Sequence, residues 1–581
     1  MLWSFHSLPC WLCRFCTVVM LAGVAGGELP AYSEAAVQAW WSSRPAEMDF
    51  AAESGTMQQA LRAAQEKAGV EGIAGQQAFL GWLEVASWLE LGATQAAGSF
   101  VLTPEGRVVF AKAGAEANLR KMFLANLSAY DDAPRAMEIL CRLVHAEVAG
   151  CRELPQLAVA VALVWDQPFP DQWPHPWVRR ADLPLGDADP VKRFRAILQV
   201  QAGVEISPGT KRTLAVDPKR LTARELMFVV DTPVELKEIG YLLQIRLADP
   251  KRLNDLFPQV AYDTARMSRD SLTWPHGTYR LIDIGKKGGI CADQAYFVSM
   301  AGKAQGIPTV LLMGQGNSGG HAWVGYVGTP GKWTLDVARY REGNYTSGAT
   351  WDPQTWRRIT DSQLALLNRE PNTTAAALRG RLLARWALMN KTAEDYPRLL
   401  GIARQAWPHS FDVWQLQAAC LVERDLPAES RRLFWENWIA AFKEDRDMRF
   451  QGQCALLRHY ESQNNAKAAE VLRAQLVSEN QRGRFDLASS LAAEPILELG
   501  SRGKWPEAHA AFEKYLAQIK GQGGGNLFYN LVQPFIEQAA QAGESTVAEA
   551  ALKLAKSRFT IEPLSTLAVD FKALEALLHG R

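Results

Sequence analysis

The chain has 581 residues, of which 48% are hydrophobic and 22% are charged, and its 63 Lys and Arg residues balance 62 Asp and Glu residues. This length exceeds what one hydrophobic core usually fills, so several domains are expected. Because the net charge is +1 and no basic tract stands out, the composition excludes proteins that hold nucleic acid or an anionic membrane through a strongly basic surface.

Residues 1–27 have the pattern of a secretory signal peptide. Arg14 precedes an apolar run of thirteen residues from Phe15, which ends in small residues around Ala25–Gly27. The run is too short for a bilayer, which needs about 20 apolar residues. We therefore predict export, to the periplasm or outside the cell, with no stable membrane span after cleavage. The alternatives are an uncleaved anchor and a misassigned start codon, with Met20 inside the run.

Residues 28–180 form the first predicted domain, which is mainly helical. Apolar residues recur at three- and four-residue spacing in segments such as 76–92, and this spacing is typical of amphipathic helices. Ser99–Ala111 interrupts the pattern with two short β-like runs around Pro-Glu-Gly and predicts a hairpin. Trp165–Trp177 carries four prolines, so we expect an extended connector there.

Residues 181–365 form the second predicted domain, of mixed character. A helix is expected from residue 291 to the Gly306-Ile307-Pro308 stop signal. Three predicted strands follow, with glycine-containing turns between them: Pro308–Gly314, Gly320–Gly328 and Lys332–Tyr340. A helix followed by a small antiparallel sheet predicts an α+β fold.

Residues 374–581 are predicted to be helical and repetitive. Four similar helix starts align on alanines 40 residues apart, at Ala428, Ala468, Ala508 and Ala548. Small residues at these places let helical hairpins stack closely, as in α-solenoids. The pattern resembles tetratricopeptide-type repeats, although the period is longer than the usual 34 and the Trp/Gly/Tyr part of that consensus is missing. An irregular helical bundle is the alternative.

Five cysteines remain outside the signal peptide, and an odd number leaves at least one thiol free even in an oxidising compartment. Cys141 and Cys151 are close enough to pair, but their segment could equally be helical with both thiols buried. His145 lies four residues after Cys141 without further ligands nearby, and no Cys/His cluster has zinc spacing. We therefore predict neither a metal site nor a cofactor.

Cys291 is the candidate nucleophile. It follows Gly288 and Gly289 and opens the predicted helix. A thiol reacts as thiolate, and the unpaired N–H groups of a helix N-terminus favour negative charge. Glycines there permit backbone geometry that other residues resist, and Lys286 and Lys287 add positive charge nearby.

A base and an orienting group are expected on the strands that follow. His321 lies in GGHAWVGY, with small neighbours that leave room for an imidazole, and Asp336 lies in the otherwise apolar WTLDVARY. If a tight turn at 328–331 joins these strands, His321 faces Ala338 and Asp336 becomes a diagonal neighbour at roughly 7–8 Å. A bulge or a different turn would change this register.

These motifs resemble the core of the transglutaminase-like superfamily, over residues 279–340. The resemblance rests on GGICADQAYFVSMAGKAQGIP, GGHAWVGY and WTLDVARY. It implies a papain-like fold in which the helix carrying the cysteine packs on a small antiparallel sheet. It also implies a triad with Cys291 as nucleophile, His321 as general base and acid, and Asp336 as the group that orients the imidazole.

The same resemblance implies an oxyanion-stabilising side chain before the cysteine. The glutamine that papain-like enzymes use is missing between Gln259 and Cys291. Trp274, by analogy with the tryptophan of transglutaminases, and Tyr279 are the candidates. His276 lies between them and could line the cleft.

Such a triad attacks an amide or thioester carbonyl and forms an acyl-enzyme, which water hydrolyses or an amine captures. For an exported protein we favour hydrolysis of a peptide or amide bond over transamidation. The helical regions on both sides suggest a protein or peptide substrate, and the C-terminal repeats could bind a protein partner. The alternative is a scaffold whose repeats bind a partner and whose central domain is not catalytic.

Overall fold

The computed structural model describes residues 29–44, 48–187, 189–268, 271–340, 345, 347–369, 375–480, 483–519 and 524–579. The predicted signal peptide, residues 1–27, lies outside these ranges. Every helix within them is too short or too polar to cross a bilayer.

The N-terminal part is helical. Its helices are α2 (Glu34–Ser42), α3 (Phe50–Ala68), α4 (Gln77–Ala93), α5 (Pro104–Ala115), α6 (Ala117–Asn126), α7 (Ala133–Ala146), α8 (Val148–Glu153) and α9 (Pro155–Val164). Helices α4 and α9 are buried along almost their whole length, which explains why their sequences are apolar on every face. One continuous core joins these helices to the first helices of the C-terminal region.

The predicted hairpin at Ser99–Ala111 is wrong. A short 3-10 turn, η3 (Phe100–Leu102), precedes α5 there. The Thr103 hydroxyl accepts a hydrogen bond from the Gly106 amide at 3.0 Å, and Pro104 occupies the first turn, where its missing N–H costs nothing. Helix capping therefore overrides the β-branched residues of this segment.

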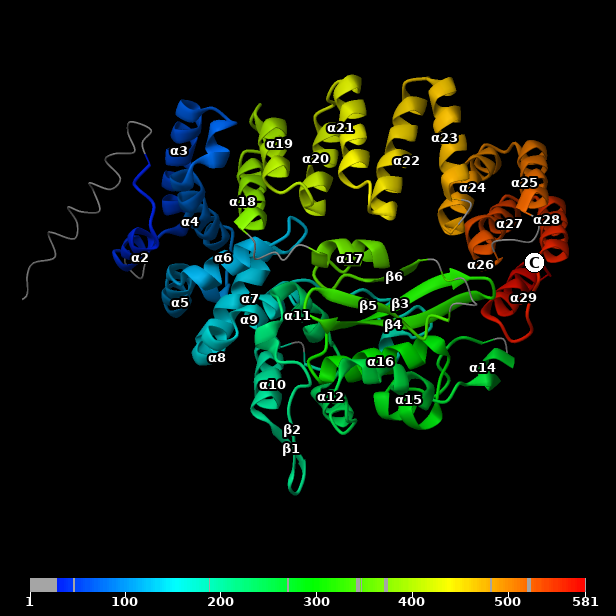
Figure 1. Cartoon of the computed structure of the whole chain (residues 1–581), viewed down its shortest axis with the longest axis horizontal. Helices are drawn as coiled ribbons and strands as arrows, with labels where there is room; N and C mark the ends of the chain where they lie inside the picture. The colour runs from blue at the N-terminus through cyan, green and yellow to red at the C-terminus, as the bar shows by residue number, and fades with distance from the viewer. Residues whose placement is uncertain are drawn as a thin grey trace, which may run out of the picture.

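A five-stranded antiparallel sheet forms the centre, in the order β5-β4-β3-β6-β7. Its strands are β3 (Thr309–Gly316), β4 (Gly319–Thr329), β5 (Lys332–Val337), β6 (Gly348–Trp351) and β7 (Arg358–Thr360). The three predicted strands are confirmed as β3 to β5, with ends shifted by up to three residues. A separate hairpin, β1 (Val204–Ser207) and β2 (Thr210–Arg212), projects from the body after α10 (Pro190–Ala202) (Figure 1).

Different helices cover the two faces of this sheet (Figure 1). Helix α16 (Cys291–Ala304) lies on one face and is backed by α12 (Leu236–Leu242) and α15 (Leu281–Lys287). Helices α11 (Ala223–Val230) and α17 (Asp361–Arg369) contribute to the apolar cluster on the other face. Every residue of α16 is buried, so the predicted helix after Gly289 is the central helix of the fold.

The C-terminal region is helical, as predicted, and arches over the sheet (Figure 1). Its elements are α18 (Ala375–Met389), α19 (Tyr396–Ala406), α20 (Phe411–Glu423), α21 (Ala428–Ala441), α22 (Arg446–Ser462), α23 (Ala466–Asn480), α24 (Phe485–Ser501), α25 (Trp505–Ile519), α26 (Gly524–Leu527), η9 (Phe528–Val532), α27 (Gln533–Gln541), α28 (Ser545–Arg558) and α29 (Thr566–His579). The four aligned alanines fall in the first turns of α21, α23, α25 and α28. A tetratricopeptide-like character stays a prediction.

Both ends of this helical array contact the rest of the molecule. Helix α18 packs against α4 and α6 at one end. At the other end, α29 meets the turn between β3 and β4, where the Thr566 hydroxyl donates to the Gly320 carbonyl at 2.9 Å and the Leu567 amide to the Ser318 carbonyl at 3.2 Å. Gly319 has a φ of 103°, and a Cβ there would lie 2.5 Å from the Leu567 nitrogen. The contact therefore requires glycine.

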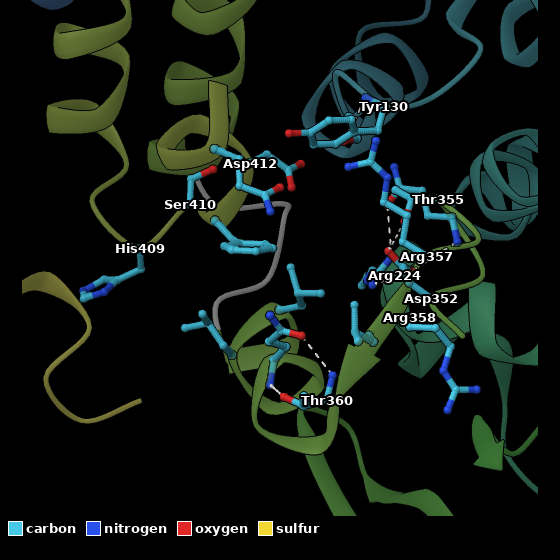
Figure 2. A pocket seen from close by; sticks show the side chains of 18 of the residues that line it. Tyr130, Arg224, Asp352, Thr355, Arg357, Arg358, Thr360, His409, Ser410 and Asp412 are labelled. Carbon is cyan, nitrogen blue, oxygen red and sulfur yellow. Dashed lines mark hydrogen bonds and ion pairs between the residues drawn. The ribbon is translucent and has the colours of Figure 1, made fainter. Parts of the chain in front are cut away.

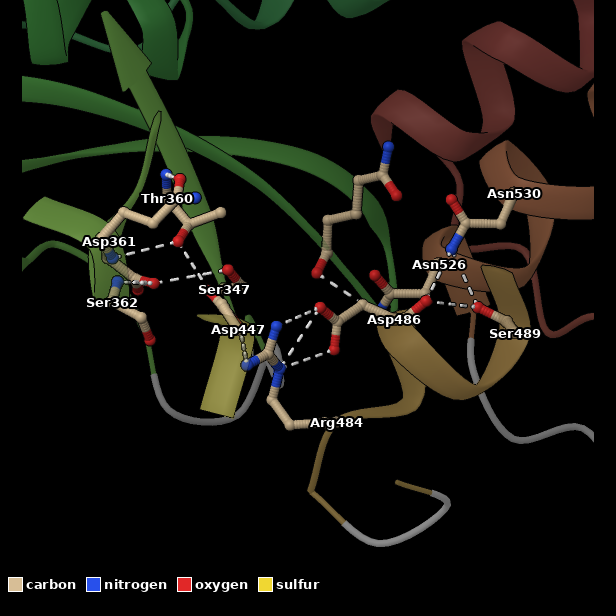
Figure 3. A network of polar contacts seen from close by, with 12 residues as sticks. Ser347, Thr360, Asp361, Ser362, Asp447, Arg484, Asp486, Ser489, Asn526 and Asn530 are labelled. Carbon is tan, nitrogen blue, oxygen red and sulfur yellow. Dashed lines mark hydrogen bonds and ion pairs between the residues drawn. The ribbon is translucent and has the colours of Figure 1, made fainter. Parts of the chain in front are cut away.

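A buried ion network ties the middle of the array to the sheet (Figure 3). The Thr360 hydroxyl, at the end of β7, donates to the Asp447 carboxylate at 2.6 Å. Arg484 forms ion pairs with Asp447 and with Asp486, the latter at 2.8 Å. Three contacts along the chain thus hold the array over the sheet.

Two neighbouring carboxyl groups are buried where the N-terminal helices meet the sheet. Asp131 accepts hydrogen bonds from the Ser128 amide at 2.7 Å and the Gln354 side chain at 2.8 Å, and Asp166 accepts one from the Asp132 amide at 2.8 Å. The other oxygen of each carboxyl has no partner among the described residues. Burial raises the pKa of Asp131 to about 8, and burial together with the nearby Asp131 charge raises that of Asp166 to about 9.

We predict that stability falls as the pH rises from about 4 to about 9. The folded state holds both carboxyl protons up to about pH 8 and that of Asp166 up to about pH 9, whereas the unfolded chain releases them above about pH 4, which gives a slope of up to about 1.4 kcal/mol per pH unit for each proton retained. Asp166→Asn should flatten the pH dependence of the thermal midpoint and raise that midpoint near pH 9. Asp425→Asn, at an exposed carboxylate, is the control. Identical pH profiles for the wild type and Asp166→Asn would contradict the shared burial of the two protons.

Candidate functional site

Cys291 lies in the first turn of α16, as predicted. The chain reaches it through Gly288, which has a φ of 80°. A Cβ atom at this position would lie 2.3 Å from the Ala261 carbonyl oxygen. The Gly289 amide donates to the same oxygen at 2.9 Å. The glycine pair therefore lets a neighbouring loop pack directly against the backbone that leads to the thiol.

The thiol of Cys291 is enclosed, since the residue is only 4% exposed. Burial raises its pKa to about 11, and the negative charge of Asp293 acts in the same direction. The backbone amides of Ala322, Ala292 and Cys291 lie against the sulfur and lower the pKa, but burial outweighs them. Cys291 is consequently a neutral thiol at pH 7, surrounded by N–H groups that favour an anion.

His321 lies near the start of β4, and its ring is held by the main chain. Its Nε2 atom is 2.7 Å from the Ala338 carbonyl oxygen. Because a carbonyl only accepts hydrogen bonds, Nε2 carries the proton and Nδ1 is left with its lone pair. Burial lowers the pKa of this imidazole, so it is neutral at pH 7 and Nδ1 can act as a base.

The structure brings the strand of His321 to the thiol, and Ala322 makes the contact. Ala322 and Val324 belong to the core around α16, whereas Trp323 belongs to the core on the opposite face. Alternation along the strand gives His321 the same side as Trp323, and their rings lie 6.2 Å apart. No hydrogen bond joins the Cys291 thiol to the His321 ring among the described residues.

The predicted register between β4 and β5 is wrong, and this affects Asp336. Tyr326 pairs with Thr334 but Val324 pairs with Val337, so β5 has one residue more than β4 between these pairs. A second bulge, on β4 between Val327 and Thr329, offsets this one, and the turn closes at Thr329 and Lys332, one residue later than expected. The register is therefore displaced by two residues, which keeps the expected parity but moves Asp336 two residues further from the position opposite His321. Asp336 is exposed, and the position expected for its carboxylate beside the ring is taken by the Ala338 carbonyl.

The three upstream candidates lie in different environments. The Tyr279 hydroxyl is buried and donates to Asp293 at 2.7 Å, so its proton is already used. Trp274 is buried, its ring lies 5.1 Å from that of Tyr279, and its indole N–H has no partner in the described part of the chain. His276 is exposed and lies against the Trp274 ring at 4.8 Å. Trp274 is therefore the candidate with a free donor.

A buried polar cluster beneath the thiol escaped the sequence analysis. Asp293 accepts hydrogen bonds from the Ile290 amide at 2.8 Å and from Tyr279, and it forms an ion pair with Arg266. The His175 Nε2 atom lies 2.9 Å from the Tyr279 hydroxyl and 3.6 Å from the carboxylate. Burial alone would raise the pKa of Asp293, but His175 and Arg266 outweigh it and hold the pKa below its ordinary value.

The five cysteines of the described chain are free, and four of them are buried. Cys141 and Cys151, for which a disulfide was left open, lie in α7 and α8 as separate thiols. Burial raises the pKa of both, that of Cys151 to about 12. No group of three or more His, Cys, Asp or Glu side chains within the described ranges is placed to hold a metal ion.

Comparison of the chain with known protein families, curated proteins and solved structures gives no match. The resemblance to the transglutaminase-like superfamily therefore rests on the motifs around Cys291, His321 and Asp336, and it stays a prediction.

We predict that Asp293→Ala lowers the free energy of local opening of α16 by about 3 to 5 kcal/mol, because Arg266 would be left as a buried charge without its partner. Native-state hydrogen exchange of the α16 amides measures this energy. Asp293→Asn, which can still accept a hydrogen bond from the Ile290 amide, should lower this free energy by less than Asp293→Ala does. Asp283→Ala, which removes a surface ion pair with Lys287, should cost about 1 kcal/mol or less. Equal exchange in Asp293→Ala and the wild type would refute the anchoring role of this carboxylate.

Proposed function

We propose that this protein is an exported, transglutaminase-like cysteine enzyme that cleaves amide bonds through an acyl-enzyme. Water is the favoured acceptor of the acyl group and an amine the less favoured one. The observation that carries the proposal is the packing of α16 on β4, which places Cys291 and Ala322 in one buried core. It supports a site in which a thiol on a helix N-terminus meets the residue that directly follows a neutral, oriented histidine.

The two pKa shifts favour a particular order of events. Because burial keeps Cys291 as a thiol and His321 as a neutral imidazole, the resting enzyme lacks a preformed thiolate–imidazolium pair. The S–H proton would pass to Nδ1 of His321 while the sulfur attacks the carbonyl carbon. Since the ring lies on the Trp323 side of β4 in the structure, this step requires the ring to turn its Nδ1 side toward the sulfur when a substrate binds.

The remaining steps follow from the groups around the sulfur. As the S–C bond forms, the carbonyl oxygen becomes an oxyanion, for which the Cys291 amide and the free indole N–H of Trp274 are the proposed donors. The imidazolium of His321 then protonates the leaving amine. Water, activated by the same ring, attacks the thioester, which releases the acid and restores the thiol.

Asp336 is the third proposed member of the triad, with a smaller role than the motif implies. The Ala338 carbonyl fixes the tautomer of His321, whereas the Asp336 carboxylate is exposed to solvent. A solvent-screened charge on the next strand stabilises an imidazolium only weakly. The substrate class that suits an enclosed thiol below a long helical array is a peptide or protein segment.

A scaffold is the second candidate function. The enclosed, neutral thiol of Cys291 and the position of His321 on the side of Trp323 favour it. In this case the array binds a protein partner, and the cysteine serves only to pack α16 against β4.

A pool of fluorogenic peptide amides with varied residues before the scissile bond tests the enzyme proposal. Cys291→Ala should abolish release of the fluorophore, His321→Gln should lower kcat/KM by about 10²- to 10⁴-fold, and Asp336→Asn should lower it by less than about 10-fold. Adding a labelled primary amine should divert only a minor part of the acyl product.

The control for a general loss of thiol chemistry is Cys454→Ala, at the least buried of the five cysteines. Turnover that survives in Cys291→Ala would refute the proposal. Turnover that is absent from the whole pool, together with array-dependent capture of a partner by Cys291→Ala, would favour the scaffold.

A further inference from the structure

A cavity of about 400 Å³ lies where the three parts of the molecule meet. Its walls come from the segment between α6 and α7, from the β6–β7 turn with α17, and from α18 to α20 of the array (Figure 2). None of Cys291, His321 and Asp336 lines it. The volume is within the range of small-molecule sites, and the site is separate from the candidate catalytic one.

Four arginines line this cavity, and two of them have acidic partners. The Arg224 guanidinium pairs with Asp352 at 2.8 Å, and that of Arg381 pairs with Asp412 at 2.9 Å. Arg358 is exposed and lies over the Trp351 ring. Arg357 is also exposed, and no carboxylate of the described chain pairs with it. Its guanidinium lies 3.9 Å from the centre of the Tyr130 ring. Figure 2 shows it beside that ring at the edge of the cavity.

Buried donors in the same walls are left without acceptors. Arg224 is only 4% exposed, yet its Nε–H has no hydrogen-bond partner in the described structure, and the Nε–H of Arg381 has none either. Buried N–H groups are usually satisfied, and a bound anion would be one acceptor for these two. The helix α20 begins at this cavity with Ser410 as its cap, and its N-terminus also favours an anion.

Apolar side chains complete the walls. Trp407 and Leu366 are almost fully buried and Phe411 partly so, and all three line the cavity. An occupant would thus meet a planar cation at one edge, an apolar surface at Trp407, Phe411 and Leu366, and polar side chains over the rest of the walls. Arginine suits carboxylate or phosphate oxygens because its N–H groups match them in pairs.

We propose that this cavity binds a small organic anion, with its carboxylate or phosphate group on Arg357 and its apolar part against Trp407, Phe411 and Leu366. The ligand bridges the sheet and the helical array. Binding there is independent of the chemistry proposed at Cys291.

Isothermal titration of the full chain at constant ionic strength tests this site, with three probes. They are N-acetyl-leucine, its uncharged amide N-acetyl-leucinamide, and inorganic phosphate. The wild type should bind at least one of the two anionic probes, and N-acetyl-leucine at least about 10-fold more tightly than its amide if the carboxylate is recognised. Tighter binding of phosphate would assign the site to a phosphate group instead.

Arg357→Gln should weaken the bound anion at least about 10-fold, whereas Arg142→Gln, at an exposed arginine of α7, should leave it unchanged. A second readout needs no substitution and is the modification of the wild type by phenylglyoxal. The bound anion should slow the modification of Arg357 and leave that of Arg142 unchanged. The proposal is overturned if neither anion binds at millimolar concentration, if Arg357→Gln binds as tightly as the wild type, or if Arg357 is not protected.

Discussion

The arrangement around Cys291 depends on one buried charge, the carboxylate of Asp293. It lies in the first turn of α16, where it accepts a hydrogen bond from the Ile290 amide and neutralises Arg266. A buried carboxylate is stable only when such partners surround it, and those partners lie on segments that otherwise share little regular structure. The short helix α14 (Thr264–Ser268) with Arg266, the Tyr279 region and the proline-rich connector with His175 all converge on it. The hydrogen bonds and the ion pair that Asp293 requires thus fix the start of α16, and with it the position of the Cys291 thiol.

That enclosure determines which chemistry the thiol can do. The same packing that orders α16 removes water from the sulfur and keeps the proton on it, and the charge of Asp293 acts in the same direction. The amides of Ala322, Ala292 and Cys291 are the opposing influence, and they stabilise negative charge only as it develops. A base with a pKa near neutrality is needed to take the proton. His321, held by the Ala338 carbonyl in a single tautomer, directly precedes Ala322 in β4, although its ring lies on the Trp323 side of the strand.

Much of the fold around the site could be predicted because its signals are local. The glycine pair, the Gly-Ile-Pro stop and the alternating strands identified α16 and β3 to β5 from their own residues. The place of the β4–β5 turn could not be predicted, since the Gly-Thr-Pro-Gly motif allows more than one closing pair; the turn closes at Thr329 and Lys332 and moves Asp336 away from its expected place. The Thr103–Pro104 cap turned a hairpin-like segment into α5. His175 and Tyr279 meet across 104 residues, a pairing for which neither periodicity nor spacing gives a sign.

The pH dependence of Cys291 alkylation by iodoacetamide, followed by mass spectrometry in the wild type and in His321→Gln, tests the pairing of thiol and imidazole most directly. If His321 takes the thiol proton, the wild-type rate rises in a step below the ordinary imidazole pKa of 6.5, because burial lowers that pKa. His321→Gln should lose this step and react only as the pH approaches the thiol pKa of about 11. Superimposable profiles, both rising only in alkali, would contradict a catalytic pair and leave Cys291 as a packing residue of α16.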